Sequence, residues 1–414
     1  MLGRRVFDYI FAGPVRAVNP WALRFLSDAN RHRNTASGAT RFAIVCNEAY
    51  AARVTDAAPP RDALPRTSAK DVARLAGVST ATVSRVINTP AQVDDATRRL
   101  VIDAIAKLGY VPHGAARALR SARSKMVGAI VPSFSYALYA RTTSALQAAL
   151  DARGYAMVLA EHHYDLSTEV RVADQLITHG VDAFAFVGLH HDPALFARLD
   201  RYGRPYVLTW GVDPMRRHPS VGFDNRAATF AITRHLIGLG HRRFALLSAP
   251  TIDNDRATER GAGVRAALAE AGLALDERCI AYGAIDLASA GSMMRRILSL
   301  RDRPTAVIGT NDVFAVGAMV ACREVGVRIP EDVSVTGVDN TELGATQTPP
   351  LTSIRTPIVE IGRAAGEQLI ARIEGKPFDP FQMLPFELVV RGSTGPARAS
   401  RRVRPPGEKV RAAS

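Results

Sequence analysis

The sequence is poor in cysteine and has no long apolar run. Its three cysteines, Cys46, Cys279 and Cys322, are odd in number and far apart, so they indicate neither a disulfide framework nor a metal-ligand cluster. This usage is typical of a protein in a reducing cytoplasm. No run of 18 apolar residues predicts a membrane span, and residues 1–25 contain arginines but not the continuous apolar segment of a signal peptide.

The patterns that usually accompany catalysis are also missing. The sequence has no Gly-rich phosphate loop and no nucleophile elbow. Two histidine pairs, His162-His163 and His190-His191, have no carboxylate at metal-ligand spacing and are expected to be polar loop ends. We therefore expect neither an enzyme nor a bound metal or cofactor.

Positive charge is concentrated at the two ends of the chain. The net charge of +14 divides into +5 for residues 1–68, +5 for 69–124 and +6 for 391–414, which leaves −2 for the long middle segment. A nearly neutral core with a basic end is typical of a ligand-binding domain joined to a nucleic-acid-binding one. A length of 414 residues predicts two or three domains.

Residues 68–88, SAKDVARLAGVSTATVSRVIN, predict two short helices joined by a tight turn. The first helix spans Lys70–Ala76, with Val72, Leu75 and Ala76 expected on one side. After Gly77, Ser79 is a good N-cap for a second helix over Thr80–Asn88. This arrangement is a helix-turn-helix, whose second helix enters the DNA major groove. The predicted core residues are Val78, Val83 and Ile87, and the predicted outward residues are Thr80, Ala81 and Arg85.

A third amphipathic helix is expected over about 95–108, with Leu100, Ile102, Ile105 and Leu108 as its apolar residues. The following stretch GYVPHGAARALRSARS contains three arginines and no acidic residue. Its Ala-rich part, residues 114–121, predicts a helix too short to be stable alone. Two packed helices with no role in DNA binding are the alternative interpretation, which the basic segment directly after them disfavours.

Residues 68–124 resemble the lac repressor (LacI/GalR) family of bacterial transcription regulators, on DVARLAGVSTATVSRVIN and GYVPHGAARALRS. Arg85 can bond guanine O6 and N7 together, with a phosphate contact or a solvated side chain as the alternatives. Ala81 suits a thymine methyl group, and the resemblance implies that Leu119 wedges between base steps in the minor groove. The predicted DNA-binding residues are Thr80, Ala81, Ser84, Arg85, Asn88, Arg117 and Leu119.

From residue 125 onward, apolar strand segments alternate with helices, which predicts parallel sheets covered on both faces. About 265 residues of this pattern favour two similar α/β lobes. Polar residues follow several strands, and ligands of such sheets bind outside the carboxyl ends of the strands. These polar clusters are Pro132-Ser133, Trp210-Gly211, Ser248-Ala249-Pro250, Asn311-Asp312 and Asp339-Asn340.

The same region resembles the family's effector-binding core, itself similar to periplasmic sugar-binding proteins, on PTAVIGTNDVFAVGAM and IPEDVSVTGVDNTELG among other stretches. The resemblance implies three crossings between the lobes. Lobe one would comprise about 126–224 and 354–378, and lobe two about 225–353 and 379–393.

By resemblance, Asp312 and Arg260 contact the polar atoms of a small effector. Capping of the next helix is the alternative role of Asp312, and a surface ion pair with Glu259 or Asp255 is that of Arg260. Tyr139 and Trp210 would offer stacking faces or pack in the core. Asp286 stands where relatives often have an aromatic residue, and Ser133 where an aspartate is common. The predicted effector-binding residues are Ser133, Tyr139, Trp210, Arg260, Asp286 and Asp312.

The sequence therefore predicts an all-α headpiece with a hinge helix over 68–124 and a two-lobed α/β core over 125–394. Residues 1–67 are expected to be a poorly ordered extension or linker, and residues 395–414 a disordered basic tail. The expected function is a cytoplasmic, homodimeric repressor that binds a pseudo-palindromic DNA operator under the control of a sugar or sugar acid. The alternative is a periplasmic-type sugar-binding protein without a DNA role.

Overall fold

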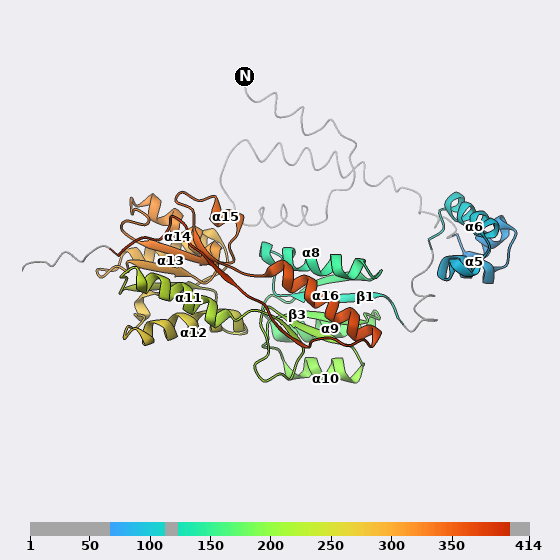
Figure 1. Cartoon of the computed structure of the whole chain (residues 1–414), viewed down its shortest axis with the longest axis horizontal. Helices are drawn as coiled ribbons and strands as arrows, with labels where there is room; N and C mark the ends of the chain where they lie inside the picture. The colour runs from blue at the N-terminus through green and yellow to red at the C-terminus, as the bar shows by residue number, and fades with distance from the viewer. Residues whose placement is uncertain (1–66, 112–122, 398–414) are drawn as a thin grey trace, which may run out of the picture. The chain divides into compact units, whose positions relative to one another are not determined.

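The computed structural model describes residues 67–111 and 123–397, and these form two separate compact units. The smaller unit has three α-helices and one short 3₁₀ helix (Figure 1). Their bounds are α4 (Ala69–Ala76), α5 (Thr80–Asn88), η1 (Pro90–Gln92) and α6 (Asp95–Leu108). The three helices expected between residues 70 and 108 are confirmed, and α5 begins and ends at the residues that the sequence indicated. The hinge helix expected over residues 114–121 lies outside the described residues.

Local capping defines the helix-turn-helix. Ser68 and Asp71 form a capping box at the start of α4, with the Ser68 backbone nitrogen 2.9 Å from Asp71 Oδ2. Gly77 ends α4 with a φ of +68°, a left-handed conformation that favours glycine. Ser79 then caps α5, its hydroxyl accepting from the Thr82 amide at 3.1 Å. The tight turn is thus specified by residues 77–79.

The small core of this unit differs in part from the expected one. Its buried residues are Val72, Ala73, Val83, Val86, Val101, Ala104 and Tyr110. The predictions for Leu75, Leu100 and Ile102 are wrong, because these side chains are about half exposed. Ile105 and Leu108 of α6 do pack against this core, partly buried, but the fully buried residues of the helix are Val101 and Ala104.

The larger unit consists of two α/β lobes, each with a six-stranded sheet (Figure 1). The first sheet has the order β11-β5-β4-β3-β1-β2, and all its pairs are parallel. Its strands are β1 (Met126–Val131), β2 (Ala156–Glu161), β3 (Ala183–Val187), β4 (Tyr206–Thr209), β5 (Ser220–Gly222) and β11 (Phe381–Met383). Helices α8 (Ala137–Asp151) and α16 (Ile358–Glu374) cover one face, and α9 (Leu166–Thr178) and α10 (Pro193–Arg201) cover the other.

The second sheet has the order β12-β10-β9-β8-β6-β7 and is parallel except for its edge strand β12. Its strands are β6 (Phe244–Ser248), β7 (Ile280–Tyr282), β8 (Ala306–Gly309), β9 (Ser334–Val338), β10 (Thr352–Arg355) and β12 (Glu387–Val389). The helices of this lobe are α11 (Asn225–Gly238), α12 (Asp255–Glu270), η2 (Glu277–Cys279), α13 (Leu287–Leu298), α14 (Asp312–Glu324) and α15 (Glu342–Ala345).

The predicted division into lobes is correct in outline and wrong at two places. Ile354 and Arg355 belong to β10 in lobe two, not to lobe one. Strand β11 pairs with β5 and therefore lies in lobe one, not in lobe two. The chain crosses between the lobes before α11, between β10 and α16, and between β11 and β12. Within the described residues, no helix is long and apolar enough to cross a membrane.

Candidate functional sites

One exposed helix face of the smaller unit brings together most of the predicted DNA-binding residues. Thr80, Ala81, Arg85 and Asn88 are on α5 together with Ser84, which is half-buried. The Asn88 side-chain amide donates to the Ser84 carbonyl oxygen at 2.8 Å and to its hydroxyl at 3.2 Å. These bonds align Asn88 along the helix. Arg117 and Leu119 lie outside the described residues.

The larger unit contains two adjoining cavities at the carboxyl ends of strands from both sheets. The outer cavity has a volume of about 460 Å³ and is lined by Ser133 and Tyr164 from lobe one and by Ile252, Asn254 and Asp286 from lobe two, among others. Such a volume is in the range of small-molecule sites. The polar strand ends thus meet where the sequence predicted a cleft.

The inner cavity is much smaller, about 30 Å³, and has an aromatic wall of Tyr136, Tyr139, Tyr164 and Trp210. The ring centroids of Tyr139 and Trp210 are 5.4 Å apart, with planes at 74°, so Tyr139 packs edge-on against Trp210. The buried Trp210 indole Nε1 has no hydrogen-bond partner among the described residues. A buried donor without an acceptor is unfavourable, and a ligand oxygen in this cavity could accept from it.

Two buried arginines from α12 lie beside the inner cavity, and each has a carboxylate partner. Arg256 Nη1 lies 2.7 Å from Asp255 Oδ1. Arg260 donates to Asn225 Oδ1 at 2.8 Å and to the Thr310 carbonyl oxygen at 2.6 Å, and its Nη2 is 3.5 Å from Asp339 Oδ1. The alternative of a surface ion pair for Arg260 is therefore wrong. Arg256, which the sequence analysis missed, precedes Arg260 by one helical turn on the same face.

Asp312 is buried inside lobe two and is not among the residues that line either cavity. Its carboxylate accepts from the Ser353 hydroxyl at 2.6 Å and from the Thr341 amide and hydroxyl at 2.6 and 2.8 Å. Burial, reinforced by the charge of Asp339, raises the pKa of Asp312 to about 7. The preceding residue, Asn311, lines the inner cavity and caps α14. Contact between Asp312 and an effector stays a prediction, while Asn311 is the residue on the wall.

Two of the four paired histidines are not the polar loop ends that the sequence indicated. His162 and His191 are buried on either side of Glu169, a residue of α9 that the sequence did not connect with them. His163 and His190 remain largely exposed, with their nearest carboxylates at 3.5 and 3.4 Å. In the part of the chain that the structure describes, no group of His, Cys, Asp and Glu residues could hold a metal ion.

Comparisons with known proteins match both units. Residues 68–113 match bacterial regulatory proteins of the lacI family, and residues 233–394 match a periplasmic binding protein-like domain. The HTH-type transcriptional regulator CelR of Thermobifida fusca is 37% identical over 331 residues, covering 78% of this chain and 96% of CelR. The repressor PurR of Aliivibrio salmonicida (strain LFI1238) is 32% identical over 329 residues, covering 78% and 98%.

Solved structures of transcription regulators are also similar to this chain. The lac repressor dimer bound to operator and the anti-inducer ONPF is 28% identical, with a TM-score of 0.72, and the match covers 80% of this chain and 99% of that one. A CelR–cellobiose complex is 34% identical, with a TM-score of 0.59, and covers 79% and 100%.

A helix-turn-helix headpiece joined to a two-lobed binding core defines a class of DNA-binding transcription regulators. The chain belongs to the lacI family of this class. The predicted fold class and regulatory function are confirmed, and the alternative of a binding protein without a DNA role is wrong. Its relatives are regulators and not enzymes.

Proposed function

We propose that the chain is a cytoplasmic, homodimeric repressor that binds a pseudo-palindromic operator and is controlled by a neutral carbohydrate held between its two lobes. The observation that carries the effector part is the pairing of charges in the cleft. Arg256 and Arg260 already have carboxylate partners, so the inner cavity offers no unpaired cation to an acidic ligand among the described residues. The outer cavity adds the carboxyl group of Asp286. An anion would meet repulsion there, whereas neutral hydroxyl groups would find donors and acceptors.

The side chains that line the cleft support the same class of ligand. The two cavities combine hydroxyl and amide side chains, such as Ser133 and Asn254, with aromatic rings that can pack against a sugar ring. Trp210 Nε1 is a donor in need of an acceptor. Cellobiose, a neutral disaccharide, accompanies the related CelR in its solved complex. Ser133, Tyr139, Trp210, Arg260 and Asp286 are therefore proposed at the site, with Asn311 in contact and Asp312 acting behind it.

A thermal-shift series on the full chain tests the effector class. Neutral mono- and disaccharides should raise the melting temperature, and matched uronic acids and sugar phosphates should not. Asp286→Asn removes the proposed repulsion and should let the corresponding uronic acid bind. Stabilisation of the unaltered protein by acids alone would contradict the proposal.

For DNA, α5 is proposed to lie in the major groove, with Arg85 bound to a guanine and with Thr80, Ala81, Ser84 and Asn88 along the same groove. The exposed position of Arg85 on α5 supports this role. Arg117 and Leu119 are proposed to contact the minor groove. Selection of bound sequences from a random DNA pool should yield a site with two symmetric halves; a single unpaired half-site would contradict a dimer.

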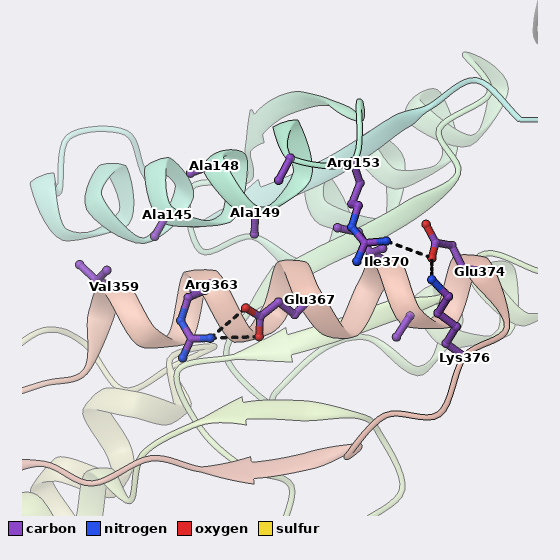
Figure 2. Close-up of a pocket in the computed structure, with 12 residues that line it drawn as sticks. Ala145, Ala148, Ala149, Arg153, Val359, Arg363, Glu367, Ile370, Glu374 and Lys376 are labelled. Atoms are coloured by element: carbon purple, nitrogen blue, oxygen red, sulfur yellow. Dashed lines mark hydrogen bonds and ion pairs between the residues drawn. The ribbon is translucent and has the colours of Figure 1, made fainter. Parts of the chain in front are cut away.

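A groove of about 540 Å³ between α8 and α16 supports the proposed dimer. Figure 2 shows the small residues Ala145, Ala148 and Ala149 of α8 beside α16, with the ion pair of Arg363 and Glu367 on the latter helix. Small side chains permit close approach of a second helix, and a polar rim is typical of interfaces. The proposed occupant is the same face of a second copy, which the symmetry of a dimer requires.

A further inference from the structure

Tyr136 lies at a junction of the two lobes. It is the N-cap residue of α8, and its ring lines both the inner and the outer cavity. Its hydroxyl crosses from lobe one to lobe two, where it donates to Asp339 Oδ2. One side chain therefore forms part of the cavity wall, the start of a helix and a bond between the lobes.

Asp339 is held firmly in place to receive this bond. It follows β9 with a φ of +110°, which is rare for a residue other than glycine and is sustained only by strong surrounding contacts. Its amide donates to the Ile354 carbonyl oxygen at 2.7 Å, and its other carboxylate oxygen lies 3.5 Å from both Arg260 Nη2 and Thr356 Oγ1. The carboxylate is completely buried, so the Tyr136 hydroxyl replaces hydration that it has lost.

The lobes are also joined elsewhere, but by a different set of groups. The Leu189 amide donates to Asp255 Oδ2 at 3.0 Å, and Arg256 Nη1 donates to the Val187 carbonyl oxygen at 3.3 Å. These bonds connect the end of β3 and the loop after it with the start of α12. The bond from Tyr136 instead connects directly to α8, whose far half lines the groove in Figure 2.

We propose that the bond between Tyr136 and Asp339 is a latch that holds the two lobes together and fixes the start of α8. This latch rests on the proposed function: an effector in the cleft displaces the Tyr136 ring or donates its own hydroxyl to Asp339. Either event frees the first turn of α8. The latch thus links occupation of the cleft to the helix that borders the proposed dimer face.

The fluorescence of Trp210 can report whether the latch is closed. Tyr136 packs on Tyr139 at 5.4 Å, and Tyr139 packs on Trp210, so opening of the lobes exposes an indole that is now buried. The chain has two tryptophans, and Trp21→Phe leaves Trp210 as the single tryptophan, whose fluorescence can be excited selectively. In this background, acrylamide quenching of the full chain without DNA or sugar measures the opening of the cleft.

Tyr136→Phe removes the latch hydroxyl but keeps the ring, and it should raise the quenching constant severalfold. The matched control is Tyr164→Phe. Tyr164 lines the same cavities, and its hydroxyl lies 3.4 Å from that of Tyr139 in the same lobe, so its loss should leave quenching unchanged. Hydrogen exchange should also quicken in residues 137–141 of Tyr136→Phe but not in α10.

Asp339→Asn keeps an oxygen acceptor for the Tyr136 hydroxyl, so its quenching constant should be lower than that of Tyr136→Phe. This second variant keeps the latch testable if one of the two variants loses stability. Equal quenching in Tyr136→Phe and the parent protein, or an equal rise in Tyr164→Phe, would overturn the latch. Unchanged exchange at the start of α8 would overturn its link to that helix. Because these measurements use neither ligand nor operator, their outcome does not depend on whether the proposed effector class is correct.

Discussion

His191 and Glu169 form a buried pair in lobe one, with His191 Nδ1 2.8 Å from Glu169 Oε2. The other ring nitrogen of His191 lies 3.1 Å from the Gly188 carbonyl oxygen. One ring nitrogen faces a carboxylate oxygen and the other faces a backbone carbonyl oxygen, so the imidazole ring is held from both sides. The pair fixes the loop after β3, from which Leu189 bonds to lobe two.

Glu169→Gln should destabilise the core by about 1–3 kcal/mol, because His191 loses the buried carboxylate that pairs with it. Chemical denaturation of the full chain, followed by circular dichroism, measures the change. Glu360→Gln, on an exposed position of α16, is the control and should have little effect. Equal stability of Glu169→Gln and the parent protein would contradict this prediction.

The pH dependence of stability should contain a contribution from Asp312. Its pKa in the folded protein is raised to about 7 from 3.8, so folding favours the protonated form. This stabilisation is complete below about pH 4 and is lost as the pH rises toward 7. Asp312→Asn should flatten that part of the stability profile between about pH 4 and 8. The two Thr341 donors then face a side-chain amide, which lowers stability at every pH without changing the slope. Asp302→Asn, at an exposed position, should keep the parental slope.

Arg85→Ala should weaken binding to the selected operator by about 1–3 kcal/mol and relax the preference at one base pair. Fluorescence anisotropy with specific and random duplexes, at one salt concentration, measures both effects. Arg74→Ala is the matched control, because Arg74 is exposed on α4 and pairs with Asp71 at 3.1 Å. Equal losses on both duplexes would mean that Arg85 contacts phosphate only.

The protein should be a dimer and not a tetramer in solution. Ala148→Arg places a large cation on the α8 side of the groove and should yield monomers by light scattering. Deletion of residues 396–414 should leave the dimer intact, because that segment lacks a heptad pattern of apolar residues. A tetramer that the deletion converts to dimers would contradict this prediction.

The sequence predicted elements better than it predicted contacts. Gly77 and Ser79 mark a turn by local chemistry, so the first and last residues of α5 could be predicted from the sequence. Leu100 and Ile102 could not be placed, since several apolar stripes fit one short helix and only packing against α4 and α5 selects Val101 and Ala104. Strands β5, β7 and β11 have three residues each, too few for a visible pattern.

For the cleft, the carboxyl ends of strands indicated its location, but not which side chain faces it. Asn311 and Asp312 are neighbours, and the start of α14 directs one to the cavity wall and the other to Ser353. The cluster around Glu169 brings together His162, which follows β2, Glu169 on α9 and His191, which follows β3. No spacing in the sequence reveals such a meeting.

The path of the chain, with three crossings between the lobes, also bears on how the protein is made. Lobe one takes its helix α16 and edge strand β11 from residues 358–383, long after its other strands. On the ribosome, most of the core therefore emerges with part of its apolar surface uncovered, and native closure waits until synthesis is nearly complete. A premature stop near residue 350 would remove elements of both lobes at once, so such truncated chains should be substrates for proteases and chaperones rather than partly active regulators.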